Sequence, residues 1–278
     1  MPRHISSATI VGIPFDAASS FRRGAAEAPK RIREALASDA GNRYSESLVD
    51  LSAPEVLGDD GDVDCAGDAR GVRDAIESRI AVVVAGGSRP IALGGDHSVT
   101  HPVVRAVHRT HPRLTIVHID AHPDLYDEFE GDRHSHACPF ARIMEEGLAT
   151  RLVQVGIRAM TRHGEEQARR FGVEVIDMRA WALGARPVVD RGERIYLSVD
   201  LDGLDPAFAP GVSHPEPGGL TVREVLSLVQ GLAAPLVGAD VVECNPAVDP
   251  TGITSGVAAK LVKEIAARMH EQARGAGG

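Results

Sequence analysis

The chain has 278 residues, of which 43% are apolar and 25% charged, so it can form one large or two small globular α/β domains. Its 30 basic and 39 acidic residues give a formal charge of −9, and the basic residues are scattered, which argues against nucleic-acid binding. Three widely spaced cysteines argue against a disulfide framework. There is no apolar run long enough to cross a membrane and no hydrophobic signal core near Met1, so we expect a cytoplasmic protein.

The first third of the chain predicts a strand, two helices and a polar connection. We expect a strand at 8–13 and a helix that begins near Pro29 and continues to Leu36. Residues 41–67 are rich in Asp, Ser and Gly and are interpreted as a connecting region, although 48–51 allow a short strand. Asp68 is the predicted cap of a long helix that ends at two glycines, 86 and 87.

From there strands and helices alternate. Strands are predicted at 90–93, 114–120, 152–157, 173–176, 195–202 and 236–242, and helices at 100–109, 139–147, 164–171, 221–229 and 254–272. Thr221 and Glu224 form a predicted capping box, while 121–137 and 178–192 are interpreted as loops. This alternation predicts an α/β fold, a three-layer αβα sandwich around a parallel sheet, in a single domain that spans 1–278.

The stretch that follows the apolar run Leu114–Val117 carries three residues that can bind metal ions. Asp120, His122 and Asp124 alternate with other residues. In an extended chain alternate side chains point to the same side, so these three can converge on one point. The carboxyl end of a strand in an open α/β sheet is also where such folds place their sites.

Two further strand ends offer ligands of the same kind. The predicted strand at 195–202 ends in Asp200 and Asp202, and His97 follows the apolar run at 90–93. Any one of these residues alone is better explained as a helix cap or a satisfied polar group. Together, four carboxylates and two imidazoles are too many for one tetrahedral ion and suit two divalent ions that share carboxylates. The oxygen-rich set favours Mn²⁺ over Zn²⁺, although imidazole also admits Ni²⁺ or Co²⁺.

These three stretches resemble the signatures of the ureohydrolase family, which includes arginases, agmatinases and related hydrolases of guanidino groups. The signatures are GGDHS at 94–98, DAHPD at 120–124 and SVDLDGLDPAFAPG at 198–211. The likeness runs through nearly the whole chain. Segments 135–145, 210–220 and 237–243 are most similar to the plant-type arginases. The resemblance implies an arginase-like fold, two Mn²⁺ ions per subunit and a homo-oligomer, either a trimer or a hexamer.

The resemblance also assigns roles to individual residues. It implies that one ion is held by His97, Asp120, Asp124 and Asp200, and the other by His122, Asp120, Asp200 and Asp202. Asp124 would in addition orient the attacking hydroxide that the metal pair generates. Glu243 would grip the planar guanidinium through paired charge-assisted bonds. His136, rather than His134, would carry protons to the leaving amine, and His214 would contact the substrate.

The substrate implied is a small cationic guanidino compound, most consistent with L-arginine, which would yield L-ornithine and urea. Animal-type arginases read the amino-acid end of arginine with an Asn and an Asp, and Tyr126 and Thr161 occupy those places here. Agmatine and other guanidino compounds therefore remain alternatives. Two different classes also stay open: a catalytically silent binding protein on the same fold, and a metal-dependent deacetylase, which the duplicated carboxylates disfavour.

Overall fold

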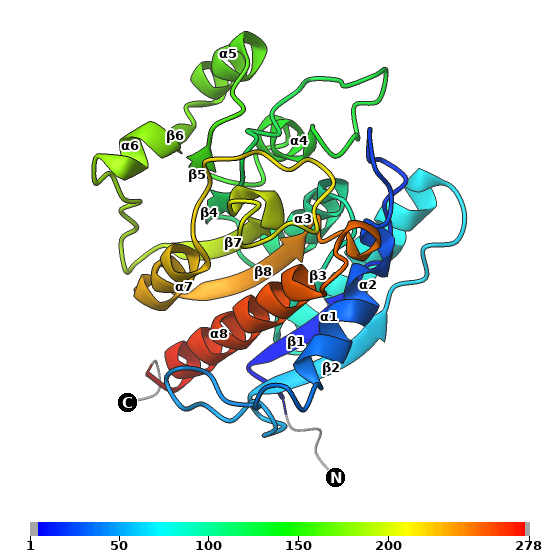
Figure 1. Cartoon of the computed structure of the whole chain (residues 1–278), viewed down its shortest axis with the longest axis vertical. Helices are drawn as coiled ribbons and strands as arrows, with labels where there is room; N and C mark the ends of the chain where they lie inside the picture. The colour runs from blue at the N-terminus through cyan, green and yellow to red at the C-terminus, as the bar shows by residue number, and fades with distance from the viewer. Residues whose placement is uncertain (1–4, 276–278) are drawn as a thin grey trace.

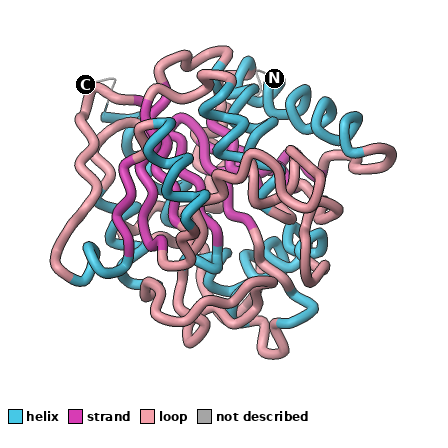
Figure 2. Tube along the Cα trace, turned by 90° about the horizontal axis from the view of Figure 1, so that it is seen from above, coloured by secondary structure: helices cyan, strands magenta, loops and turns pink. Residues whose placement is uncertain are grey.

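The structure is a computed structural model that describes residues 5–275. A parallel sheet forms its middle layer (Figures 1 and 2), and the strand order in the described part of the chain is β2-β1-β3-β8-β7-β4-β5-β6. The strands are β1 (Ala8–Gly12), β2 (Leu57–Asp62), β3 (Arg89–Leu93), β4 (Leu114–Ile119), β5 (Arg151–Ile157), β6 (Glu174–Asp177), β7 (Arg194–Asp200) and β8 (Leu236–Val242). The predicted parallel α/β fold is confirmed.

Helices cover both faces of this sheet. They are α1 (Ala28–Leu36), α2 (Ala69–Ala85), α3 (Thr100–His108), α4 (Pro139–Glu145), α5 (Arg162–Phe171), α6 (Met178–Ala182), α7 (Val222–Gly231) and α8 (Ile253–Gly275). One hydrophobic core joins the sheet to α1, α6, α7 and α8, and a second joins its other face to α2, α3, α4 and α5. These are the three layers that the alternating pattern predicts.

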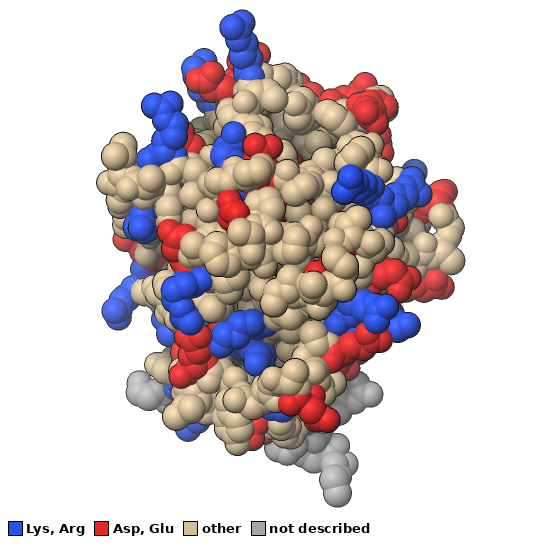
Figure 3. All heavy atoms as spheres, viewed as in Figure 1, with Lys and Arg blue, Asp and Glu red and all other residues tan. Residues whose placement is uncertain are grey.

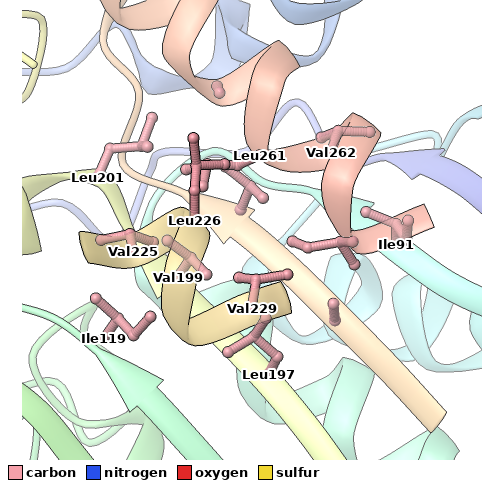
Figure 4. Close-up of a cluster of buried hydrophobic side chains, with 14 of the residues drawn as sticks. Ile91, Ile119, Leu197, Val199, Leu201, Val225, Leu226, Val229, Leu261 and Val262 are labelled. Atoms are coloured by element: carbon pink, nitrogen blue, oxygen red, sulfur yellow. The ribbon is translucent and has the colours of Figure 1, made fainter. Parts of the chain in front are cut away.

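Side-chain alternation along the strands builds the two cores. In β1, Ile10 belongs to one core and its neighbour Val11 to the other. Because both faces are covered, the central strands are buried along nearly their whole length and are mainly apolar on both faces. Figure 4 shows the core between the sheet and the pair α7 and α8, where Val229 of α7 lies next to Leu197 of β7 and Leu261 of α8 lies next to Leu226 of α7.

The predicted helix caps are present. The Asp68 side chain accepts a hydrogen bond from the amide of Gly71 at 2.7 Å, so α2 begins where its first free N–H groups find an acceptor. Thr221 and Glu224 form the reciprocal capping box at the start of α7. These short-range patterns fix where both helices begin.

Three local predictions are wrong. The connecting region 41–67 contains the edge strand β2, which begins at Leu57. The proposed short strand at 48–51 is a loop with only an isolated bridge between Tyr44 and Asp50. The loose connection 178–192 begins with helix α6, whose cap is Asp177.

Basic and acidic side chains intermingle on the face of the molecule that Figure 3 shows, and neither sign gathers into a continuous patch there. Among the helices that the structure describes, none combines the length and the apolar character that a bilayer span requires.

Candidate metal centre and active site

Four neighbouring strands end at one edge of the sheet and bring the predicted site residues together. The strands β3, β8, β7 and β4 are consecutive in the sheet. His97 follows β3, Glu243 follows β8, Asp200 is the last residue of β7 and Asp120 follows β4. Parallel strands all present their carboxyl ends at the same edge, which is why residues so distant in sequence meet here.

His97 is the centre of the first group of potential ligands. Its Nδ1 atom lies 3.2 Å from Asp120 Oδ2, 3.0 Å from Asp124 Oδ2 and 3.1 Å from Asp200 Oδ2. The His97 side chain is fully buried, and among the described residues its Nδ1 has no hydrogen-bond partner of acceptable geometry. A buried nitrogen without a partner, facing three carboxylate oxygens, is the arrangement that a divalent cation would satisfy.

The other ring nitrogen of His97 shows which tautomer is present. Ser198 Oγ donates its hydrogen to Asp240 Oδ1 at 2.7 Å, so it must accept one from His97 Nε2 at 3.0 Å. Asp240 is itself held by hydrogen bonds from Thr100 Oγ1 and Tyr196 Oη at 2.9 and 2.5 Å. The hydrogen of His97 is therefore on Nε2, and the lone pair of Nδ1 faces the three carboxylates.

His122 is the centre of a second group. Its Nδ1 atom lies 3.2 Å from Asp202 Oδ2 and 3.4 Å from Asp120 Oδ1, so Asp120 takes part in both groups. The backbone amide of His122 donates to Asp120 Oδ1 at 2.6 Å, and the amide of Asp202 donates to Asp200 Oδ1 at 2.8 Å. These bonds fix the orientation of both carboxylates, whose Oδ2 atoms face His97.

The electrostatics of the two groups show uncompensated negative charge. Burial raises the pKa of Asp200 well above its usual range, and the charges of Asp202 and Asp120 raise it further. Burial and the charge of Asp120 likewise raise the pKa of Asp202 to about 7. Burial alone would lower the pKa of His122, but Asp202 and Asp120 outweigh it and raise that pKa to about 12. A divalent cation would remove this repulsion and release the proton from His122, so the residues fit a metal site.

His118 belongs to the site and was missed by the sequence argument. It is fully buried in β4, and its Nε2 lies 2.8 Å from Asp120 Oδ2. Gln154 Nε2 donates to His118 Nδ1 at 3.1 Å, so the ring hydrogen lies on Nε2 and points at Asp120. The Phe140 ring stacks on the imidazole with centroids 3.9 Å apart. A histidine inside an otherwise apolar strand was the signal available, because a buried imidazole requires polar partners.

The loop after β1 forms one wall of the site. A Cβ atom at Gly95 would lie 1.8 Å from Phe15 O, so only glycine allows this loop to approach so closely. The amide of Asp96 donates to Phe15 O and Asp96 Oδ2 accepts from the amide of Ala18, both at 2.9 Å. The amide of His136 in turn donates to Ala18 O at 3.2 Å, which links the loop to a predicted catalytic residue.

His136, His214 and Glu243 lie together beside the carboxylate groups, as the sequence argument requires. His136 Nδ1 is 3.4 Å from Glu243 Oε1, and its Nε2 is 2.8 Å from Ser20 Oγ. The His214 ring stacks on His136 with centroids 5.0 Å apart. Burial alone would lower the pKa of His136, but Glu243, Asp124 and Asp96 outweigh it and raise the pKa to about 9. Ser20, in a loop without a local signature, was not predicted.

Two of these carboxylates are held in the left-handed backbone region. Asp124 has a φ of 48° and Glu243 a φ of 61°. Non-glycine residues avoid this conformation at a cost of about 1–2 kcal/mol, so the surrounding contacts must hold it. Glu243 is fixed by its amide, which donates to Gly95 O at 2.9 Å, and by its Oε1, which accepts from the amide of His97 at 2.9 Å. Its Oε2 atom is buried and has no partner among the described residues.

A cavity of about 210 Å³ opens onto these groups. It is lined by Ser20, His122, Pro123, Asp124, Tyr126, Phe129, His136, Ala137, Ala159, Thr161, Asp200, Asp202, His214 and Glu243. Tyr126 and Thr161, which the sequence argument assigned to the places of the amino-acid readers of animal-type arginases, both lie in its wall. Tyr126 Oη is 3.4 Å from Thr161 Oγ1, and its ring stacks on His163.

Comparison with known proteins agrees with this architecture. The model of the arginase family matches residues 6–267. Arginase 1, mitochondrial, of Arabidopsis thaliana is 48% identical over 279 residues, which cover 95% of this chain and 81% of that protein. Guanidinopropionase of Pseudomonas aeruginosa is 37% identical over 282 residues, which cover 95% of this chain and 87% of that protein. The structure of arginase from Medicago truncatula superposes with a TM-score of 0.89 at 45% identity and covers 95% of this chain and 88% of that chain.

The fold and these matches define a ureohydrolase, an enzyme that acts on the C–N bonds of guanidino groups. The chain belongs to the arginase family. The resemblance seen in the three sequence signatures, including its similarity to plant arginases, is therefore confirmed.

The prediction of a cytoplasmic location is wrong by the same comparison. The plant relatives are named mitochondrial arginases, and one is named chloroplastic/mitochondrial. The sequence argument tested only for a hydrophobic signal core, whereas mitochondrial transit peptides are amphipathic and rich in arginine. An argument from a missing hydrophobic core could therefore not distinguish the two compartments.

Proposed function

We propose that this enzyme hydrolyses L-arginine to L-ornithine and urea with two Mn²⁺ ions per chain. The observation that carries the proposal is the arrangement around His97 Nδ1, a buried lone pair that faces three carboxylate oxygens at 3.0–3.2 Å. His122 with Asp120 and Asp202 supplies the second group, which shares Asp120 with the first. The carboxylate-rich donor set favours Mn²⁺, and Ni²⁺ or Co²⁺ are the alternatives that imidazole ligands admit.

The ligand roles follow the two groups. His97, Asp120, Asp124 and Asp200 would hold one ion, and His122, Asp120, Asp200 and Asp202 the other. When bound, such a metal pair supplies Lewis acidity and makes a water molecule nucleophilic near neutral pH. Asp124 lies in the cavity wall beside both groups, where its carboxylate can accept a hydrogen bond from that water and orient it.

Glu243 is the proposed partner of the guanidinium. Its Oε2 atom is buried without a partner, and its side chain lines the cavity. Burial would raise the pKa of this carboxyl, but His136 and the amide of His97 outweigh it and keep the pKa below its usual range. An ionised carboxylate with a free oxygen can pair with the N–H groups of a planar cation and fix its orientation.

His136 is the proposed proton donor to the leaving amine. With its pKa raised to about 9, the imidazole is protonated at neutral pH. Ser20 and Glu243 hold the ring from two sides, at Nε2 and Nδ1. Because the ring also lines the cavity, its proton is within reach of a bound substrate. His214 stacks on this ring and would contact the substrate beside it.

Urea release with L-arginine, agmatine and 4-guanidinobutyrate at equal Mn²⁺ loading tests the proposal. We expect the highest kcat/KM with L-arginine, as the 48% identity to a plant arginase favours. Tyr126 and Thr161 carry no charge that could read an α-amino group, which is why agmatine is the alternative that the assay must include. A higher kcat/KM with agmatine would overturn the substrate and leave the reaction unchanged. Urea release from none of the three would refute the proposal.

A further inference from the structure

A third group of potential ligands lies in the substrate cavity, apart from the two carboxylate-rich groups. His136, His214 and Glu243 each offer a ligand atom, and these atoms lie within 4.8 Å of one another. All three side chains line the cavity. Two imidazoles and one carboxylate are a ligand set that proteins use for Zn²⁺ with an open fourth position.

The spacing of these atoms is close to that of a metal site. Zinc–nitrogen and zinc–oxygen bonds of about 2.1 Å place neighbouring tetrahedral ligands about 3.4 Å apart. His136 Nδ1 and Glu243 Oε1 are already 3.4 Å apart. The ligand atom of His214 lies within 4.8 Å of the other two, so these separations exceed the ideal one by at most about 1.4 Å. Its side chain is only partly buried and lines the cavity, where its ring lies against those of Phe21, His122 and His136.

Glu243 and His136 can each present a ligand atom to such an ion. Glu243 Oε2 is buried and has no hydrogen-bond partner among the described residues. Ser20 Oγ lies 2.8 Å from His136 Nε2 and can accept its hydrogen, so an ion would bind at Nδ1, towards Glu243, and displace the proton that this nitrogen carries at neutral pH. A hydroxyl behind the ring would thus fix the metal-binding tautomer, as outer partners do in other metal sites.

We propose that His136, His214 and Glu243 form an inhibitory site for one Zn²⁺ ion, separate from the two groups that bind the catalytic metals. Two nitrogen ligands and one oxygen ligand favour Zn²⁺ over Mn²⁺, whereas the oxygen-rich groups favour Mn²⁺. An ion at this place occupies the carboxylate that would grip the guanidinium and the imidazole that would donate the proton. Zn²⁺ therefore competes with the substrate. This kinetic consequence rests on the proposed function, but the binding of the ion does not.

Metal counting separates this site from the catalytic centre. Enzyme saturated with Mn²⁺ is dialysed against rising Zn²⁺, and both metals are measured per chain by inductively coupled plasma mass spectrometry. We expect one Zn²⁺ to enter while the Mn²⁺ content stays constant. With L-arginine as substrate, Zn²⁺ should raise KM and leave kcat unchanged.

His214→Phe keeps an aromatic ring against His136 but removes a ligand, and it should weaken Zn²⁺ binding at least about 10-fold. His214→Gln should do the same, and the Mn²⁺ content of each variant shows whether it has folded. His163→Gln is the matched control, because His163 stacks on Tyr126 away from the three ligands and should leave Zn²⁺ binding unchanged.

Uptake of Zn²⁺ only in exchange for Mn²⁺ would refute the site. Equal Zn²⁺ binding by the wild-type enzyme and both His214 variants would refute it as well. If the Mn²⁺-loaded protein releases no urea even before Zn²⁺ is added, but then takes up Zn²⁺ without losing Mn²⁺, the zinc site would stand and the proposed function would be wrong.

Discussion

Replacing Glu243 with Gln tests how the substrate is held. The amide retains an oxygen that can accept the hydrogen bond from the amide of His97, now 2.9 Å long, so the loop should stay in place. The free, buried Oε2 is exchanged for an NH₂ group, which points a donor at the guanidinium and removes the negative charge. Breaking one side of a buried ion pair costs about 3–5 kcal/mol. We therefore expect kcat/KM to fall between about 10²- and 10⁴-fold.

The assay is urea release over a range of L-arginine concentrations, with the metal content of each preparation measured beside it. Glu243 is not one of the proposed ligands of the catalytic metals, so that content should not change. Glu264→Gln is the control, since Glu264 is an equally buried carboxylate, 2% exposed, but bonds to Lys260 within α8. It should affect stability and not kcat/KM. A fall in kcat/KM of less than about 10-fold for Glu243→Gln would refute the reasoning. So would a fall that is explained by a lower metal content of the variant.

Three further changes address the metal groups and the pH dependence of folding. Asp202→Asn should lower the bound Mn²⁺ by about one ion per chain because it removes a carboxylate from the group around His122, and an unchanged content would contradict its role. Ser198→Ala leaves the Nε2 hydrogen of His97 unpaired and should weaken Mn²⁺ binding about 10- to 100-fold in chelator competition; equal affinity would show that this contact does not orient the ring. Burial lowers the pKa of His101 from 6.5 to about 4, so the unfolded chain takes up this proton first and stability should fall by about 3 kcal/mol between these two pH values. His101→Gln should lose less stability over that range in denaturant titrations, and identical pH profiles would exclude the effect.

The central strands were predictable because each is a mainly apolar run that is buried on both faces. The edge strand β2 was not, because its sequence LGDDGD has no hydrophobic pattern and four of its residues are exposed. It is held by its pairing with β1 and by Arg33, which bonds to Asp59 and Asp62. Helix α6 has only five residues, too few for a helical period to show.

The sequence predicted most of the residues that meet at the site, but not the backbone conformation that brings them together. The alternation of Asp120, His122 and Asp124 was taken as an extended strand, but β4 ends at Ile119 and Asp124 has a positive φ. Asp124 nevertheless lies 3.0 Å from His97, since the turn brings it back towards the ligand group. His118 escaped notice because it sits inside the apolar run, where only the tertiary contacts with Gln154 and Phe140 explain a histidine.

The position of β8 has a consequence for the order of events during synthesis. This last strand of the chain lies between β3 and β7, so it alone joins the β2-β1-β3 group to the other four strands. A nascent chain that ends before Leu236 carries two unpaired apolar strand edges, which is the condition under which partly made proteins associate wrongly. The same insertion delivers Glu243 to the other strand ends. The sheet is therefore closed and the site completed in the same late step. A ribosome-bound chain without β8 would be inactive and would need protection from wrong association.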